Sequence, residues 1–443
     1  MKPVPSYRQI WEIAYPIILS LIAQNVVNVT DTAFLGRLGE IPLGAAAIGG
    51  LFYVALFMLG FGFATGVQIL TGRYNGRDQL HRIGEVVMQG FFTLLLFALT
   101  LILVYHVAGT SIINITVKSE NIRQATTEFL RFRIWGLLPA FLNVNFRAFY
   151  VGITRTRVLS LSSFLMAGLN VILDYALIFG HFGLPAMGIS GAAIASVISE
   201  SASALFFIAY TRYKCNFQNY ALKFPFKLRW KVFRTTIDLS VWVMLQNFVS
   251  LAGWLVFFMM VEKTGELNLA ASNVIRSLYL VMMIPIWGFA TSVNTLVSNS
   301  MGAYGPKYVT KIIGKVAVLS TILLAIVSLL MLLFPVPMLR IYTPDPEIIK
   351  AARPVMYLIS GVLPLFSISI MLFNGVTGTA NTRISMLIEF SAIVIYLWAA
   401  YCLAIVWEKS LTIIWSVEYL YFIVLGGLSL IYLRSGHWKK IKI

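Results

Sequence analysis

The sequence predicts an all-α polytopic membrane protein whose twelve transmembrane helices form two pseudo-symmetric six-helix lobes. Its 443 residues are 59% hydrophobic and 12% charged, with a mean hydropathy of +0.84, whereas charged residues make up about 25% of an average soluble domain. The apolar runs suit helices that cross a bilayer, because they are apolar on all sides and lack the alternation of barrel strands. The chain also repeats itself half-way along, which predicts the two lobes.

A requirement of about 20 apolar residues for each crossing defines the spans in order. Their limits are residues 10–38, 44–72, 84–108, 126–151, 157–180, 188–211, 236–262, 270–302, 310–337, 352–377, 383–406 and 413–434. The even number of spans places both termini on the same side of the membrane.

Charge in the connectors predicts which side that is. The net charge of +17 comes mostly from Lys and Arg in alternate short connectors, which is the positive-inside pattern rather than a nucleic-acid surface. The densest connector separates the two lobes and includes Lys223, Lys227 and Arg229. We therefore expect an N-lobe at 1–211, a basic cytoplasmic linker at 212–235, a C-lobe at 236–443, and cytoplasmic termini.

The repeat rests on several matches at one offset, which is close to half the length of the chain. Gly62-Phe-Ala-Thr65 recurs as Gly288-Phe-Ala-Thr291, and Thr156-Arg157 recurs at the same spacing as Thr382-Arg383. This spacing, which we call the repeat offset, joins the second span to the eighth and the fourth to the tenth, so the halves share one orientation. Parallel repeats of this kind are a transporter architecture in which substrate binds between halves that rock.

The first span carries two unusual residues, Pro16 and Asp31. A carboxylate inside a span is costly and usually serves a function in a protein interior or a wet cavity. Proline removes a backbone hydrogen bond and bends helices, so we expect Pro16 to bend the first helix. The hypothesis is that Asp31 binds and releases a cation as the protein changes shape; the alternative is a helix cap or a pair with Arg37.

The fifth span adds Asn170 and Asp174, which share one helix face because they are four residues apart. With Asp31, and a hydroxyl from Ser196 in the sixth span, they would form a site for H+ or Na+. Two carboxylates in one dry site cannot both ionise freely. The alternative is a polar contact that only joins helices. At the repeat offset the two acids correspond to Phe257 and Ala400, so the C-terminal half lacks them.

Three further charged residues inside spans have open roles. Glu389 forms an interfacial ion pair near Arg383 or has a function, and Arg147 locks the half-bundle or responds to protonation. We expect Glu200, late in the sixth span, to extend to the membrane surface.

Aromatic and methionine side chains of the C-terminal half predict where a flat, apolar substrate binds. Such residues offer pliable, polarisable surfaces, although on apolar helices they usually only pack. The residues concerned are Trp242, Trp254, Trp287, Tyr279 and Met282.

Taken together, these motifs resemble those of the multidrug and toxic compound extrusion (MATE) family. The likeness covers essentially the whole chain and rests on the order and spacing of its motifs: Pro16 with Asp31-Thr-Ala-Phe-Leu-Gly-Arg-Leu-Gly39, Gly152-Ile-Thr-Arg-Thr-Arg157, Asn170-Val-Ile-Leu-Asp174, Gly188-Ile-Ser-Gly-Ala-Ala-Ile-Ala195 and Gly375-Val-Thr-Gly-Thr-Ala-Asn-Thr-Arg383. The resemblance implies a V-shaped two-lobe exporter driven by H+ or Na+. The implied cation site is Asp31, Asn170 and Asp174, with Ser196 where relatives often have threonine. Ser250 stands where one branch has a glutamate, so the chain looks more like the DinF-like branch.

The expected function is efflux of cationic amphiphilic drugs by H+ or Na+ antiport through alternating access. We expect a monomer in a prokaryotic inner membrane that uses no cofactor beyond the coupling ion, with Na+, where used, held by Asp31, Asn170 and Asp174. The first alternative is a flippase of the same superfamily for lipid-linked sugars or other lipids. An intramembrane enzyme is disfavoured, because the four histidines show no metal-binding pattern with acids. We expect small molecules and the bilayer as partners, and no nucleic acid.

Overall fold

The computed structural model describes residues 3–215, 220, 222 and 229–440. In these ranges every regular element is a helix, and helical segments cover each predicted span. Lys223 and Lys227 of the predicted linker lie outside the described residues.

The helices group into two compact units, which we call the N unit (Leu19–Met244) and the C unit (Met1–Ile18 with Leu245–Ile443). Two long helices, α1 (Tyr7–Leu38) and α9 (Trp230–Glu262), contribute to both units. The units therefore follow packing rather than sequence order. The predicted lobes, 1–211 and 236–443, stay a prediction.

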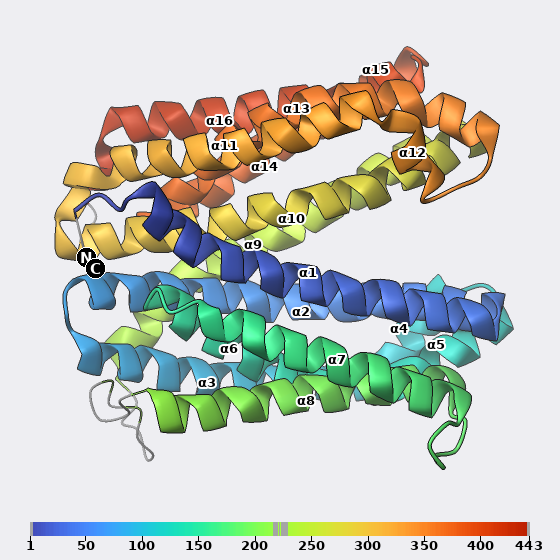
Figure 1. Cartoon of the computed structure of the whole chain (residues 1–443), viewed down its shortest axis with the longest axis horizontal. Helices are drawn as coiled ribbons and strands as arrows, with labels where there is room; N and C mark the ends of the chain where they lie inside the picture. The colour runs from blue at the N-terminus through green and yellow to red at the C-terminus, as the bar shows by residue number, and fades with distance from the viewer. Residues whose placement is uncertain (1–2, 216–219, 221, 223–228, 441–443) are drawn as a thin grey trace. The chain divides into compact units, whose positions relative to one another are not determined.

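The N unit is built on α2, which packs against α3, α5 and α6, while α7 and α8 lie side by side (Figure 1). Its elements are the later part of α1, α2 (Glu40–Gly76), α3 (Leu80–Val104), the π turn η1 (Tyr105–Gly109), α4 (Thr110–Thr116), α5 (Glu120–Arg133), the 3₁₀ turn η2 (Ile134–Gly136), α6 (Leu137–Gly152), α7 (Arg157–Phe179), α8 (Gly188–Lys214) and the start of α9.

The C unit is built on α13, which packs against α10, α11 and α16. Its elements are the first turns of α1, the rest of α9, α10 (Glu266–Ala303), η3 (Gly305–Tyr308), α11 (Val309–Leu333), α12 (Pro335–Arg340), α13 (Pro346–Gly378), α14 (Thr382–Tyr401), η4 (Cys402–Val406), α15 (Leu411–Trp415), α16 (Val417–Ser435) and η5 (His437–Lys440).

Within the described ranges, eleven helices are long and apolar enough to cross a membrane. The fourth predicted span, 126–151, differs because it is divided into α5, η2 and α6. Pro139 has no N–H to donate to the carbonyl of Trp135, and the helix tightens into a 3₁₀ turn at that point. The division leaves Arg133 at the end of α5, where it enters the site described below.

Close helix packing supports the internal repeat. A Cβ atom added to Gly62 would lie 2.8 Å from the Met244 Cα, and one added to Gly288 would lie 2.3 Å from the Ile18 Cγ1. The first pair belongs to the N unit and the second to the C unit. The repeat offset that relates Gly62 to Gly288 also relates Ile18 to Met244. The two units therefore use corresponding residues to pack the helix that each takes from the other half of the sequence.

Candidate cation-exchange site

Side chains on α1 and α7 hold these two helices together in the N unit. The hydroxyls of Ser20 and Ser163 are 2.6 Å apart and share a hydrogen bond. Further along α1, the Phe34 ring meets the Phe179 ring edge-on, with 5.6 Å between their centres. Asp31 lies on α1 just before Phe34, so this contact places it against α7.

The predicted meeting of two acids and an amide is present in the N unit. Asp174 and Asn170 are fully buried on α7, and Asp31 is half-buried. With its nitrogen turned toward the acids, the Asn170 amide donates to Asp31 Oδ1 at 3.1 Å and to Asp174 Oδ2 at 3.2 Å. One amide nitrogen is therefore within hydrogen-bonding distance of both carboxyl groups. The amide thus bridges two acids that lie far apart in the sequence.

This arrangement suits a proton. Two carboxyl groups held by one amide in a dry site cannot both ionise freely, because their negative charges repel each other. Asp174 Oδ1 is buried and has no hydrogen-bond partner among the described residues, which makes a negative charge at this residue costly. A proton on one of the acids would remove one of two like charges from the same site.

A sodium ion fits the same residues less well. Na+ is a hard cation and requires oxygen ligands, as Ca2+ and Mg2+ do, but the hydrogen-bonded amide turns its nitrogen toward the acids. No group of three or more His, Cys, Asp or Glu side chains in the described ranges is placed to hold a metal ion. The predicted three-residue Na+ site, which includes an amide, stays a prediction, and no step below depends on it.

An ion pair beside the acids was not anticipated. Arg133 of α5 donates to both carboxylate oxygens of Glu200 on α8, at 2.7 and 2.9 Å, with the two side chains 13% and 17% exposed. The Arg133 guanidinium lies 3.6 Å from the Tyr53 ring centre, and the Tyr53 hydroxyl donates to Glu200. The expectation that Glu200 extends to the surface is wrong, because Arg133 supplies a buried partner. Both charges are close enough to interact electrostatically with Asp31.

The remaining predicted residues of the N unit are placed apart from the acids. Ser196 is half-buried on α8, and among the described residues no hydrogen bond joins it to either acid. Arg37 is exposed and forms no ion pair with Asp31 within those ranges. The Arg147 guanidinium lies 5.6 Å from the Phe61 ring centre in a cation–π contact, and its two predicted roles stay predictions. Pro16 lies inside a continuous α1.

The C unit contains buried acids as well. Glu418 on α16 is 3% exposed and accepts hydrogen bonds from Tyr279 at 3.2 Å and from Tyr396 at 3.1 Å. Sequence reasoning missed Glu418, because its partners lie on α10 and α14 and no local pattern marks them.

Glu389 is equally buried, but its partners differ from those expected. It accepts hydrogen bonds from Ser250 and, at 2.8 Å, from Tyr421. Within the described ranges it forms no ion pair with Arg383. The interpretation as an interfacial ion pair is therefore wrong, and two hydroxyl groups solvate this acid instead.

The predicted substrate-lining residues have varied surroundings. Tyr279 is buried against Glu418, whereas Trp254 is half-buried and its ring lies 6.5 Å from the Tyr279 ring. Trp287 is 47% exposed and Met282 is half-buried, both on α10. Trp242 belongs to the N unit. A substrate pocket formed by these five side chains stays a prediction.

Comparison with known proteins identifies the family. A family model described as MatE matches residues 16–176 and 243–402, which together make up more than half of the chain. The chain belongs to the MATE family of multidrug efflux transporters. The two matched blocks are separated by essentially the repeat offset, in agreement with the repeat.

Individual relatives match most or nearly all of the chain. A probable multidrug resistance protein NorM from Thermotoga maritima is 25% identical over 99% of this chain and 95% of its own length. A protein of the same description from Pasteurella multocida is 26% identical over 77% and 74% of the two chains. A solved MOP-superfamily transporter from Pyrococcus furiosus superposes with a TM-score of 0.91 at 16% identity, covering 98% of this chain and 97% of its own. These likenesses agree with the all-helical transporter fold; the DinF-like branch stays a prediction.

Proposed function

We propose that this MATE protein exports cationic amphiphilic compounds in exchange for protons taken up by Asp31 and Asp174. The observation that carries the proposal is the amide-bridged pair of acids. A buried acid pair with one shared proton can exist in two charge states, and such a pair is a natural coupling element in a transporter.

In the proposed cycle, the doubly ionised pair favours binding of a cationic substrate, and protonation removes that preference. Ion and substrate therefore oppose each other's binding, which is the negative coupling that exchange requires. The energy scale is adequate, since moving one charge across about 100 mV is worth about 2.3 kcal/mol.

Helix α1 is the element that responds to the charge state in this proposal. It carries Asp31 and contains Pro16, whose missing N–H weakens the helix at one point. When both acids are ionised, their repulsion pushes the segment of α1 that carries Asp31 away from α7. When one is protonated the hydrogen bonds re-form and draw it back. Alternating access would follow from this motion.

The proposal also includes the membrane in which the protein works and its oligomeric state. We expect the protein to work as a monomer in the inner membrane of a prokaryote, with both termini in the cytoplasm. Support comes from the basic connectors that the positive-inside rule places there and from the bacterial source of the relatives named above.

The test is export of a cationic dye from inverted or reconstituted vesicles under separate pH and Na+ gradients. We expect transport by the wild type to follow the pH gradient, and Asp31→Asn to lose this dependence. Asp78→Asn is the matched control, because Asp78 is an exposed residue with a positive φ of 57° that asparagine adopts readily. Export by Asp31→Asn that still follows the pH gradient at the wild-type rate would contradict the proposal.

A further inference from the structure

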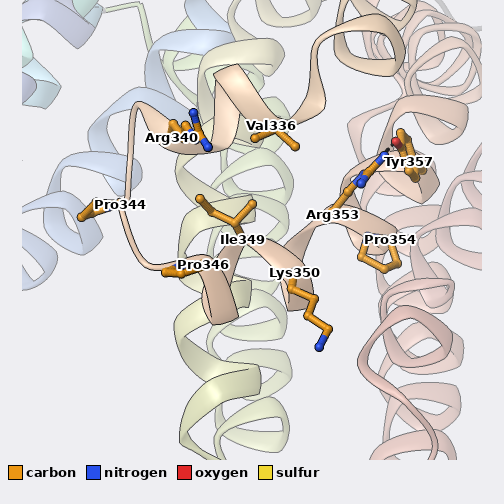
Figure 2. Close-up of a pocket in the computed structure, with 9 residues that line it drawn as sticks. All are labelled: Val336, Arg340, Pro344, Pro346, Ile349, Lys350, Arg353, Pro354 and Tyr357. Carbon is orange, nitrogen blue, oxygen red and sulfur yellow. Dashed lines mark hydrogen bonds between the residues drawn. The ribbon is translucent and has the colours of Figure 1, made fainter.

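The C unit has a surface pocket that the transport proposal does not use. It has a volume of about 550 Å3 and lies where α12 and the following connector cover the start of α13 (Figure 2). This volume is within the range of about 300–1,000 Å3 typical of small-molecule sites. Apolar side chains, among them Val336 and Ile349 and three prolines, form much of its wall.

Three cationic side chains line this pocket. Arg340 comes from α12, and Lys350 and Arg353 come from α13 (Figure 2). No acid is among the nine lining residues, and in the described part of the chain none of the three cations forms an ion pair. The nearby Asp345 is engaged, since it accepts hydrogen bonds from the first N–H groups of α13.

One of the cations is held in place. The Arg353 Nε donates to the Tyr357 hydroxyl at 2.9 Å, and its guanidinium lies 5.6 Å from the Tyr357 ring centre. The guanidinium keeps further N–H groups that can donate in pairs to a phosphate. Three positive charges without an acid on an apolar wall favour an anion that also carries apolar surface.

The position of the pocket indicates where such an anion comes from. Helices α11 and α13 are both candidate membrane spans, so α12 joins them at the membrane surface. Apolar side chains beside the pocket point outward: Leu333 is 61% exposed and Ile341 is 76% exposed. Exposed apolar residues next to Arg and Lys are typical of elements that lie at the lipid headgroups.

We propose that this pocket binds the phosphate of an anionic amphiphile, namely the headgroup of an anionic phospholipid from the surrounding bilayer. Arg340, Lys350 and Arg353 neutralise the phosphate, and the apolar residues beside them receive the upper part of the acyl chains. The alternative source of the same chemistry is soluble phosphate, which lacks the acyl chains.

The experiment uses the full chain purified in detergent, with lipid binding followed by native mass spectrometry and by thermal unfolding. The probes are phosphatidylglycerol, phosphatidylcholine and inorganic phosphate. The test variant is Arg340→Gln/Lys350→Gln/Arg353→Gln. The matched control, Lys118→Gln/Lys263→Gln/Lys409→Gln, removes the same charge from exposed connector positions outside the pocket.

We expect wild type and control to bind phosphatidylglycerol more tightly than phosphatidylcholine, and the pocket variant to lose at least tenfold in affinity for phosphatidylglycerol. Stabilisation by phosphatidylglycerol well above that by phosphate identifies the lipid as the occupant. Equal stabilisation by the two overturns the lipid assignment. Unchanged binding by the pocket variant, or an equal loss in the control, overturns the site itself.

Discussion

The largely buried ion pair between Arg133 and Glu200 gives a quantitative test of the site, through the substitution Glu200→Gln. The two side chains are 13% and 17% exposed and form two hydrogen bonds. Removing one partner of a buried pair costs about 3–5 kcal/mol, because the other charge remains uncompensated. The Tyr53 ring stays 3.6 Å from the guanidinium and stabilises it in part. We therefore expect a loss near the lower limit, about 3 kcal/mol.

The assay is unfolding of the purified protein in mixed micelles, followed by circular dichroism as the denaturing detergent is titrated. Glu12→Gln provides a control, because Glu12 pairs with Arg8 at 3.0 Å but the two side chains are 41% and 89% exposed. Exposed pairs contribute about 0–1 kcal/mol. The double substitution Arg133→Met/Glu200→Leu should recover most of the stability lost in Glu200→Gln. A loss in Glu200→Gln no larger than in Glu12→Gln would refute the buried-pair interpretation.

Three further predictions concern single positions. Gly378→Ala should destabilise the C unit by about 1–3 kcal/mol in the same unfolding assay. The reason is that the alanine Cβ would lie 2.6 Å from the Asn294 carbonyl oxygen. A variant as stable as the wild type would contradict this packing. Glu418→Leu should lower the free energy of unfolding by about 2 kcal/mol or more, since two buried tyrosine hydroxyls lose their acceptor. Glu418→Gln should lower it by less. Equal losses in the two variants would argue against the hydrogen bonds. Pro16→Ala should slow dye export without weakening dye binding, because alanine restores the backbone hydrogen bond that proline removes. Export at the wild-type rate would show that bending at this residue is not needed.

The spans and the acid pair could be predicted because each depends on local signals. Helix spans follow from long apolar runs, and helical segments cover each expected span, although the fourth is divided and several helices extend well beyond the expected limits. Asn170 and Asp174 share a helix face by their spacing alone. That Asp31 joins them followed from the cost of an unpaired acid inside a span, which leaves few places for its side chain.

The partners of the other acids could not be predicted in this way. Glu200 is paired by Arg133, the last residue of α5 before the 3₁₀ turn, and Glu418 is solvated by tyrosines from two distant helices. Such pairings depend on which faces of α5, α8, α10, α14 and α16 meet. The hydropathy of α8, α14 and α16 is similar on all sides, so their sequences alone do not specify that orientation.

The exchange of helix segments between the two halves of the sequence limits how the chain can be divided. Ser240 from the start of α9 donates to the Phe63 carbonyl in the N unit, while Trp11 from the start of α1 contacts Phe289 in the C unit. A fragment that ends in the connector after α8 would lack the first of these segments and leave the N unit open along α2. Two fragments that each keep one complete unit would therefore have to divide or duplicate α1 and α9, because both helices contribute to both units.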